Sequence, residues 1–205
     1  MEHFALRLVS SRMLAPAVRH FSFARADGAP MAFVPGQFVQ VHFQHQGVAL
    51  KRSYSIATVS EGASSGLVEM AVSYVPGGAA TALFEGLDAG DEIDASGPYG
   101  RFVLHDDPTV RRYLLIATGT GVTPYRSMLP QIRERIRERG QRFVLLFGAR
   151  NPEELLYGEE FEAFAREHEG FVFHPCFSRA ARAQPEAFDR RGHVQDQLAA
   201  LAPDP

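Results

Sequence analysis

The chain has 205 residues, of which 45% are hydrophobic and 22% charged, and its formal net charge at pH 7 is −3. This composition is typical of a globular protein and argues against nucleic-acid binding, which usually needs a basic surface. The single cysteine, Cys176, excludes an intrachain disulfide and a four-thiolate metal or iron–sulfur site, and no metal site is predicted. No signal peptide or membrane span of ~20 apolar residues is visible, so we expect a soluble, cytoplasmic protein in a reducing compartment.

The first half of the chain consists of short segments in which polar and apolar residues alternate, separated by turn signals such as Pro35-Gly36. Strands of this length and spacing indicate an antiparallel barrel or sandwich. One helix is expected, over residues 79–87. The expected strands are residues 4–8, 18–23, 38–43, 52–57, 67–74 and 91–95.

Strands and helices alternate after Asp106-Asp107-Pro108, which predicts a parallel sheet in the second half. Strands are expected over residues 113–117, 143–149 and 171–178, and the first is apolar enough to be buried on both faces. Three helices are expected. The first is capped by Thr123, has Pro124 at its first position and ends before Gly140. The second covers residues 152–169 with an interruption near Gly158, and the third covers residues 194–201. The predicted domains are residues 1–106 and 107–205.

Residues 52–55 read Arg-Ser-Tyr-Ser and lie on an expected strand beside Lys51, the chain's only lysine. A guanidinium can bind a phosphate with two hydrogen bonds, an aromatic ring can lie flat on a planar ligand, and a hydroxyl can meet a ring nitrogen. The segment is therefore a candidate binding site. A half-exposed strand with ordinary polar residues explains the same pattern.

Two glycine-containing segments precede expected helices, where free backbone N–H groups favour phosphate. Residues 75–81, Val-Pro-Gly-Gly-Ala-Ala-Thr, could hold a pyrophosphate, although by themselves they suit a plain turn better. Residues 117–124, Ala-Thr-Gly-Thr-Gly-Val-Thr-Pro, follow a strand, which is where open α/β sheets place nucleotides. The second segment lacks the third glycine of the dinucleotide fingerprint and the lysine of a P-loop.

Arg150 and Ser178-Arg179 follow two successive expected strands. An acid after the first of these strands would suit a free ribose 2′-hydroxyl, whereas an arginine suits a 2′-phosphate. These residues therefore favour NADP(H) over NAD(H). The alternative is that both arginines are solvated surface residues, since 20 of the 21 basic residues of the chain are arginine.

Together and in this order, these segments resemble the ferredoxin–NADP⁺ reductase superfamily, in particular its compact bacterial type. Residues 90–93 and 97–102 also match the family's barrel closure, so the resemblance covers nearly the whole chain. It implies a Greek-key antiparallel barrel that binds FAD, followed by an α/β domain that binds NADP(H). Relative to the family pattern the α/β domain lacks its C-terminal part, and His193 stands where relatives often carry arginine.

The resemblance also implies roles for the residues. Arg52 would hold the FAD pyrophosphate, Tyr54 would pack on the flavin and Ser55 would hydrogen-bond its hydride-accepting nitrogen, so that Tyr54 and Ser55 are the expected catalytic residues. Thr120 and its glycine neighbours would contact the nicotinamide nucleotide. The residues expected to bind cofactors are Arg52, Ser53, Tyr54, Ser55, Gly77, Gly78, Ala79, Ala80, Thr81, Thr118, Gly119, Thr120, Gly121, Thr123, Pro124, Arg150, Ser178 and Arg179.

The activity that the resemblance implies is electron transfer from NADPH through FAD to a transiently bound ferredoxin or flavodoxin, by a monomer. Two other enzyme activities remain open, that of a free-flavin reductase and that of the reductase component of an oxygenase. A third alternative is a flavin-binding electron-transfer subunit without NADPH turnover of its own.

Overall fold

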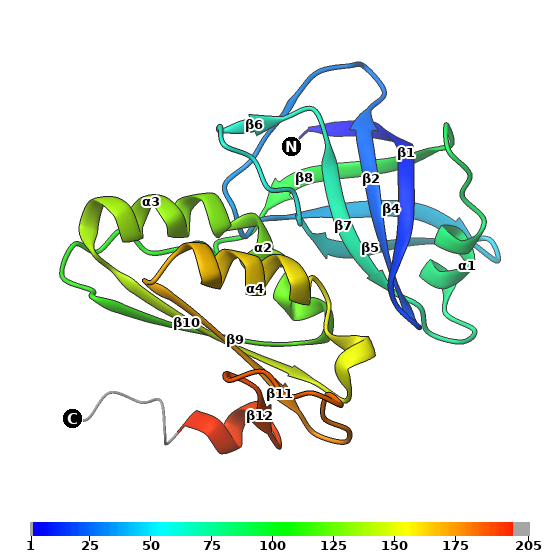
Figure 1. Ribbon diagram of the computed structural model, residues 1–205. Coiled ribbons are helices and arrows are strands. Elements are labelled where there is room, and N and C mark those ends of the chain that lie inside the picture. The colour runs from blue at the N-terminus through cyan, green and yellow to red at the C-terminus, as the bar shows by residue number, and fades with distance from the viewer. Residues whose placement is uncertain (1, 199–205) are drawn as a thin grey trace. The chain divides into compact units, whose positions relative to one another are not determined.

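The computed structural model describes residues 2–198, which divide into two compact units (Figure 1). The first unit comprises the chain up to His105 together with Thr123–Pro130. The second comprises Asp106–Val122 and the chain from Gln131 onward. The chain therefore leaves the first unit, returns to it for one short segment, and leaves it again.

The first unit is built on a six-stranded antiparallel sheet in the order β5-β4-β8-β1-β2-β7. The end strands β5 and β7 contact each other, so the sheet closes on itself as a barrel (Figure 1). A two-stranded ladder of β3 and β6 accompanies it. The strands are β1 (His3–Ala15), β2 (Val18–Arg25), β3 (Met31–Ala32), β4 (Phe38–His45), β5 (Val48–Ser55), β6 (Ser64–Ser65), β7 (Val68–Ser73) and β8 (Glu92–Tyr99).

Alternation of side chains along these strands fills the barrel with one apolar core. Val39 and Val41 of β4 are fully buried, while their neighbours Gln40 and His42 are partly exposed, as period-two alternation requires. Every long strand except β5 contributes further core residues, and Phe84 of the helix over residues 79–85 and Ile56 join them, while Tyr54 of β5 packs at the margin. The sequence prediction of an antiparallel barrel is therefore confirmed.

Several elements of the first unit differ in length from the sequence expectation; β8, for example, was expected over residues 91–95 and extends to Tyr99. Strand β1 runs well past residue 8, because register shifts between Leu8 and Ser10 and between Met13 and Ala15 let it keep pairing with β2. Strand β5 begins at Val48, four residues before the expected Arg52, as it pairs with β4 through residue 45.

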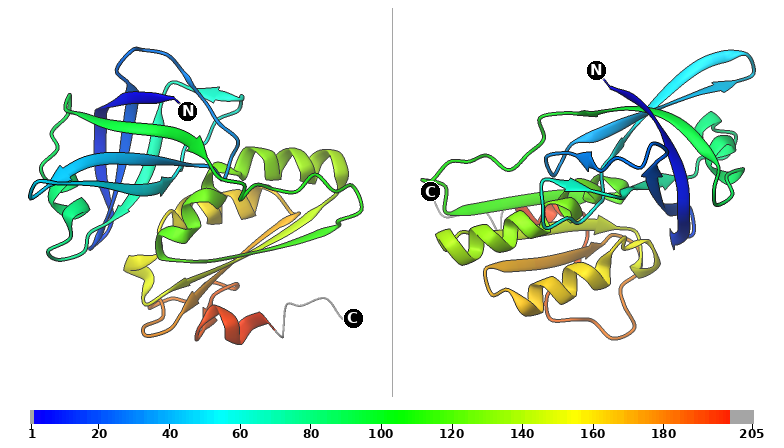
Figure 2. Two further views of the ribbon diagram at one scale, coloured as in Figure 1. Left: turned by 180° about the vertical axis from the view of Figure 1, so that it is seen from behind. Right: turned by 90° about the horizontal axis from the view of Figure 1, so that it is seen from above.

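The second unit has a parallel sheet in the order β12-β11-β10-β9. Its strands are β9 (Arg112–Thr118), β10 (Arg142–Ala149), β11 (Phe171–Phe177) and β12 (Arg190–Arg191). Helices α3 (Leu129–Arg139) and α4 (Gly158–Glu167) cover one face, and the 3₁₀ turn η3 (Val194–Gln197) lies on the other (Figures 1 and 2). The other short elements are α1 (Ala79–Glu85), α2 (Thr123–Ser127) and the 3₁₀ turns η1 (Gly119–Val122) and η2 (Pro152–Glu154).

Strand β9 corrects one expectation. Its apolar run predicted burial on both faces, but Leu114 is 40% exposed and Ile116 39%. Leu115 and Ala117 on the opposite face are buried. The reason is that β9 is the edge strand of the described sheet, and η3 packs on Leu146 and Cys176 of the inner strands instead.

The expected helix from Thr123 to Gly140 is in fact two helices, α2 and α3. Pro130 has no N–H for the carbonyl of Arg126, so the hydrogen-bond ladder is interrupted near Met128. Thr123 is the first residue of α2, but its hydroxyl is buried without a hydrogen-bond partner among the described residues, so the expected capping bond is not formed.

The remaining helix expectations hold in part. The helix over 152–169 is divided into η2 and α4, with Tyr157 in the left-handed region at φ 56° between them. The closing helix over 194–201 is observed only as the turn η3, and residues 199–201 lie outside the described range. No helix in residues 2–198 has the length and apolarity to cross a membrane.

Candidate functional site

The central segment of the candidate site is the end of β5. Arg52 pairs with Val41 across the ladder and Tyr54 pairs with Val39, so these four residues share one face. Both valines are fully buried, yet Arg52 is exposed and its guanidinium donates to the carbonyl oxygen of Lys51 at 2.8 Å. A guanidinium open to solvent at the margin of an apolar face is well placed to receive an anionic ligand.

The ring of Tyr54 is fixed by α1. It meets Phe84 edge-on, with ring centroids 5.3 Å apart, and Phe84 is part of the barrel core. Burial raises the pKa of Tyr54 to about 12, against a smaller lowering by the charge of Arg52. The phenol therefore stays protonated at neutral pH, and the partly exposed ring offers a rigid aromatic surface next to the Arg52 guanidinium.

Strand alternation separates the two serines from this pair. Ser53 pairs with Gln40 and Ser55 with Phe38, which places their side chains on the face opposite Arg52 and Tyr54. The structure thus brings Arg52 and Tyr54 together, and sets Ser55 at the last position of the strand on the other side of the pleat.

The turn at residues 75–78 leads into α1. Gly78 donates its N–H to the carbonyl of Val75 at 2.8 Å, with Pro76 and Gly77 at the corners. Gly77 has φ +71°, the left-handed value that the third position of a type II turn requires. The hydroxyl of Thr81 accepts from the N–H of Val75 at 2.8 Å, so this residue stabilises the turn while Ala79 and Ala80 form the first turn of α1.

Helix α2 is held in the first unit by a largely buried ion pair that the sequence analysis missed. Arg126 donates to the carbonyl of Ala57 at 2.7 Å and to Oε2 of Glu69 at 2.8 Å. The other carboxylate oxygen of Glu69 accepts from the Ser22 hydroxyl at 3.3 Å and lies 3.4 Å from Nε2 of His20. The ion pair fixes the helix whose first residues, Thr123-Pro124, end the predicted nucleotide-binding segment.

The loop after β9 lies in the second unit. Gly119 adopts φ +51° and begins η1, and no atom lies within 4 Å of where a Cβ on Gly119 or Gly121 would stand. Thr118, the last residue of β9, packs against Gly148 so tightly that a Cβ there would stand 3.0 Å from its methyl group. The loop backbone is therefore open on the side where the parallel strands β9 and β10 end.

Arg150 and Arg179 are brought together at the ends of β10 and β11. Ser178 donates its N–H to the carbonyl of Ala149, and Arg179 and Ala180 both donate to the carbonyl of Arg150 at 2.9 and 3.1 Å. Arg179 is exposed. The side chain of Arg150 donates to Glu154 at 2.6 Å, an acid that the sequence analysis did not consider.

A hollow of about 450 Å³ lies beside these strand ends. It is lined by Asn151 and by residues 180–183, among others. The Oδ1 atom of Asn151 is buried without a hydrogen-bond partner among the described residues. Asn151, which follows Arg150 directly, is a further candidate binding residue that the sequence analysis missed.

Both halves of the chain match families of oxidoreductase domains. Residues 5–104 match the oxidoreductase FAD-binding domain family, and residues 115–204 match the oxidoreductase NAD-binding domain family. The chain is therefore an oxidoreductase of the class that combines a flavin domain with a nicotinamide-nucleotide domain.

One curated relative defines the family more closely. "Ferredoxin--NADP reductase B" of Sorangium cellulosum is 39% identical over 201 residues, which are 98% of this chain and 79% of that protein. The chain belongs to the ferredoxin–NADP reductase family, as the sequence motifs predicted. "Phenol 2-monooxygenase, reductase component DmpP" of a Pseudomonas strain is 35% identical over 82% of this chain, but the chain spans only 45% of that protein.

Solved structures show the same fold. The Amycolatopsis cytochrome P450 reductase GcoB matches 99% of this chain and 59% of its own with a TM-score of 0.82 and 29% identity. A ferredoxin NADP⁺ reductase from Neisseria gonorrhoeae with bound FAD and NADP matches 98% of this chain and 76% of its own, with a TM-score of 0.79 and 23% identity. These matches confirm an antiparallel flavin domain followed by a parallel-sheet nucleotide domain.

The residues present suit both cofactors. The first unit offers the exposed Arg52 guanidinium beside the Tyr54 ring, a charge and an aromatic surface of the kind that a flavin with a pyrophosphate needs. The second offers an open glycine loop, the exposed Arg179 and the unpartnered Asn151 oxygen.

Proposed function

We propose that this chain moves electrons between NADPH and a one-electron carrier protein, using FAD bound to residues 1–106 and NADP(H) bound to residues 107–205. The observation that carries the proposal is Arg52, exposed at the margin of an apolar strand face next to Tyr54. The 39% identity to a ferredoxin–NADP reductase supports the same conclusion. The carrier would be a ferredoxin or a flavodoxin bound transiently to a monomer, and the cytoplasmic location stays a prediction.

In the first unit, FAD would be held by the charge of Arg52 and by the turn that leads into α1. Arg52 would bind the pyrophosphate together with backbone N–H groups of residues 77–81, and Tyr54 would support the flavin and its ribityl chain. When bound, FAD accepts an electron pair from NADPH and passes electrons on singly. Ser55 would donate a hydrogen bond at the reacting edge of the flavin, although its strand position is on the opposite face from Tyr54.

The second unit would hold NADPH at the ends of its parallel strands. The backbone of residues 118–121 would bind the pyrophosphate, in the position where α/β sheets bind nucleotides. Arg150, Ser178 and Arg179 would bind the 2′-phosphate, and Asn151 would accept a hydrogen bond from the adenosine portion. Thr123 and Pro124 would contribute from the start of α2.

A second candidate function is that of an oxygenase reductase component. Relatives with that description include the propane 2-monooxygenase reductase components of Mycolicibacterium smegmatis and Rhodococcus jostii, 36% and 32% identical. The chain spans 41% and 48% of those proteins. A free-flavin reductase and a flavin-binding subunit without NADPH turnover are the remaining alternatives.

Flavin content tests the first half of the proposal. The purified protein is expected to bind one FAD per chain and to prefer FAD over FMN, which has no pyrophosphate. Arg52→Ala removes a charged hydrogen bond worth about 1.5–3 kcal/mol, so the FAD dissociation constant should rise roughly ten- to a hundredfold. Lys51→Ala, on the opposite face of the same strand, is the matched control and should leave it unchanged.

Two results would refute the flavin site: tighter binding of FMN than of FAD by the wild-type protein, or equal FAD affinity of the Arg52→Ala and Lys51→Ala variants. Because flavin release is measured by fluorescence, this test does not depend on turnover.

Nucleotide choice tests the second half. Stopped-flow reduction of the flavin by NADPH should be favoured over NADH, and the double variant Arg150→Ala, Arg179→Ala should lose most of this preference. Two charged contacts support a preference of about a hundredfold, reduced because both side chains meet solvent. Arg137→Ala on the exposed side of α3 is the control. Equal use of NADH and NADPH by the wild-type protein would make the two arginines surface charges only.

The acceptor separates a ferredoxin–NADP reductase from a free-flavin reductase and from an electron-transfer subunit. A ferredoxin–NADP reductase should reduce ferredoxin or flavodoxin faster than free FMN or FAD. Reduction of free flavin alone would favour the flavin reductase, and flavin that NADPH does not bleach in the full-length protein would favour the electron-transfer subunit.

A further inference from the structure

Strands β4 and β5 end as a pair, and the chain just beyond them binds α2. Phe38 pairs with Ser55, and one backbone hydrogen bond of 2.9 Å follows at the next position. Continuing this register by one more position places Gly36 opposite Ala57. Both of these residues form hydrogen bonds with side chains of α2.

Two neighbouring side chains of α2 make these bonds. The Ser127 hydroxyl accepts from the N–H of Gly36 at 3.1 Å and donates to the carbonyl oxygen of Pro124 at 2.7 Å. Nη1 of Arg126 donates to the carbonyl oxygen of Ala57 at 2.7 Å. The helix is thus bound to the continuations of both strands, so its position is tied to that of the end of β5.

The guanidinium of Arg126 is itself held by Glu69 of β7. The same Nη1 donates to Oε2 of Glu69 at 2.8 Å, and the two side chains are only 11% and 17% exposed. The N–H of Ala57 donates to the backbone carbonyl of Glu69 at 2.7 Å, so both acceptors of Nη1 belong to one backbone junction. A charged contact with so little access to water is screened less than an exposed one, and it holds its geometry more firmly.

This contact joins two segments to which the proposed function gives different cofactors. Thr123-Pro124, expected at the nicotinamide nucleotide, begins α2, and residues 54–55, expected at the flavin, end β5. Ala57 lies two residues after the end of β5, and Arg126 lies about one helical turn after Thr123. The bond between them therefore links both segments through short stretches of chain that lie entirely within the first unit.

We propose that Arg126 is a positioning residue for hydride transfer, an inference that rests on the proposed function. In that step a C–H bond of NADPH breaks, and its hydrogen and electron pair pass to FAD, giving NADP⁺ and the anionic reduced flavin. Arg126 acts through the backbone, because it fixes the start of α2 against the end of β5. A misplacement of about 1 Å can lower the rate of such a step about a hundredfold.

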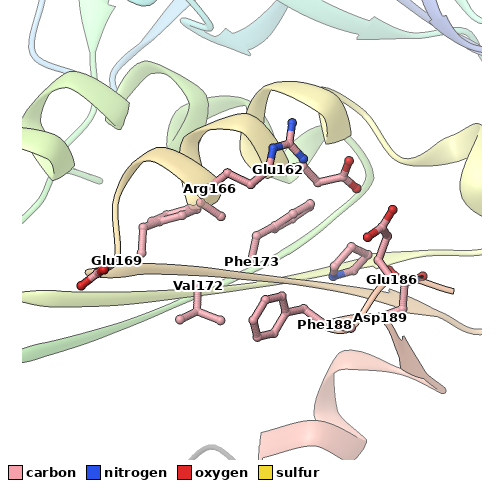
Figure 3. A pocket seen from close by; sticks show the side chains of 12 residues that line it. Glu162, Arg166, Glu169, Val172, Phe173, Glu186, Phe188 and Asp189 are labelled. Carbon is pink, nitrogen blue, oxygen red and sulfur yellow. Dashed lines mark hydrogen bonds between the residues drawn. The ribbon is translucent and has the colours of Figure 1, made fainter.

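A second arginine–carboxylate network, in the other unit, supplies a control. Glu162 of α4 binds Arg182, which lies 3.7 Å from Asp189, and both acids line the hollow between α4 and segment 186–189 (Figure 3). The Glu162 side chain is 24% exposed, close to the value for Glu69. No residue of α2 or β5 lines this hollow, so a change at Glu162 alters an ion pair of the same kind without altering α2.

Substitutions of Arg126 in the full-length, flavin-loaded protein test the proposal. Arg126→Met keeps the apolar stem and removes both bonds, whereas Arg126→Lys supplies one nitrogen where the single Nη1 makes both. The rate constant of flavin reduction at saturating NADPH should fall about tenfold or more in Arg126→Met and less than about threefold in Arg126→Lys. The dissociation constant of NADP⁺, measured by difference absorbance, should change less than about twofold in both.

Arg135→Met is the matched control. Arg135 is 9% exposed, as Arg126 is, but it binds the hydroxyl of Tyr113 in the second unit. This variant loses a buried arginine without loosening α2, so its flavin should be reduced at the wild-type rate.

Two readouts report on position rather than on stability. With NADPH deuterated at the transferred hydrogen, the isotope effect on flavin reduction should depend more steeply on temperature in Arg126→Met, because a looser donor–acceptor distance must be shortened by thermal motion. Without turnover, the Gly36 amide bound by Ser127 should exchange its hydrogen about fivefold faster or more in Arg126→Met, and at the wild-type rate in Arg135→Met.

Two milder variants decide the question if Arg126→Met does not fold. Ser127→Ala removes the bond to Gly36, and Glu69→Gln removes the charge that holds Arg126. Each should slow flavin reduction at saturating NADPH about threefold or more at unchanged flavin content. Glu162→Gln, the control for Glu69→Gln, should match the wild type.

Failure of this inference and failure of the proposed function give different results. If NADPH does not reduce the flavin of the wild-type protein, the proposed function is wrong and this inference is wrong with it. If the wild-type flavin is reduced, the inference alone is overturned by any of three results. These are a wild-type rate in Arg126→Met or in both milder variants, a slowing explained by weaker NADP⁺ binding, and a slowing no greater than that of Arg135→Met.

Discussion

The buried pair of Glu69 and Arg126 should make the first unit sensitive to acid. Burial by itself raises the pKa of Glu69, but hydrogen bonds from His20 and Arg126, and their charges, outweigh it and lower the pKa from 4.5 to about 2. At about 1.4 kcal/mol per pH unit, this difference corresponds to about 3 kcal/mol of folding stability at neutral pH.

The sign of the pH dependence follows from the direction of this shift. A carboxylate whose pKa is lower in the folded state stabilises fully above its unfolded pKa, near 4.5, and loses its contribution as the pH falls toward 2. At pH 3 less than half of the contribution should remain. Glu69→Gln should therefore lower the stability of the barrel by about 3 kcal/mol at pH 7 and by about half that or less at pH 3.

The measurement is urea unfolding followed by circular dichroism, with hydrogen exchange of the β7 amides to isolate the first unit. Glu92→Gln is the matched control. Glu92 also binds an arginine, Arg7, at 2.8 Å, but this pair is about half exposed and should contribute less than about 1 kcal/mol. If both variants lose the same stability, or if the Glu69→Gln difference is equal at pH 7 and pH 3, the assigned role of the buried pair is wrong.

Three further predictions concern single positions. Gly36→Ala would place a Cβ 1.9 Å from the carbonyl oxygen of Phe102, at φ +101°, so urea unfolding should show a loss of at least about 2 kcal/mol in the free energy of unfolding. Gly28→Ala is the control: Gly28 has φ +75° but open space around it, so this variant should lose about 1 kcal/mol. Glu154→Gln releases Arg150 from an ion pair worth up to about 1 kcal/mol. The KM for NADPH should therefore fall about two- to fivefold, and the KM for NADH should not change. A rise in the KM for NADPH would show that Glu154 positions Arg150 productively. Ser55→Ala should slow single-turnover flavin reduction by NADPH in the full-length protein at unchanged flavin content, and an unchanged rate would remove Ser55 from the site.

Local periodicity was sufficient for most of the fold. Strands β4, β10 and β11 were expected within one or two residues of their observed bounds, because alternation or a continuous apolar run is visible in the sequence itself. The interruption between α2 and α3 was missed although Pro130 signals it, since apolar residues at helical spacing continue on both sides. The exposure of Leu114 and Ile116 depends on strand order, which periodicity does not reveal.

The candidate site was predictable to a similar degree. The Arg-Ser-Tyr-Ser segment and the glycine turns could be found because each is contiguous, and the assignment of their individual roles stays a prediction. The partners of Arg126 could not be found, because Glu69 is 57 residues away in sequence and the pairing exists only in the folded barrel. Asn151 stands out only once burial is known, since an unpartnered oxygen leaves no trace in sequence.

The return of Thr123–Pro130 to the first unit matters for anyone who recombines these proteins. In a chimera with one junction near residue 106, the barrel comes from one parent and residues 123–130 come from the other. Glu69 of the first parent would then pack against the residue that the second parent has in place of Arg126. Such a swap keeps residues 1–106 together, whereas the compact first unit also contains residues 123–130. Exchanging residues 106–122 and the chain from 131 onward as two separate pieces, with 123–130 kept from the barrel's own parent, preserves the contacts of this segment with the barrel, such as that of Arg126 with Glu69.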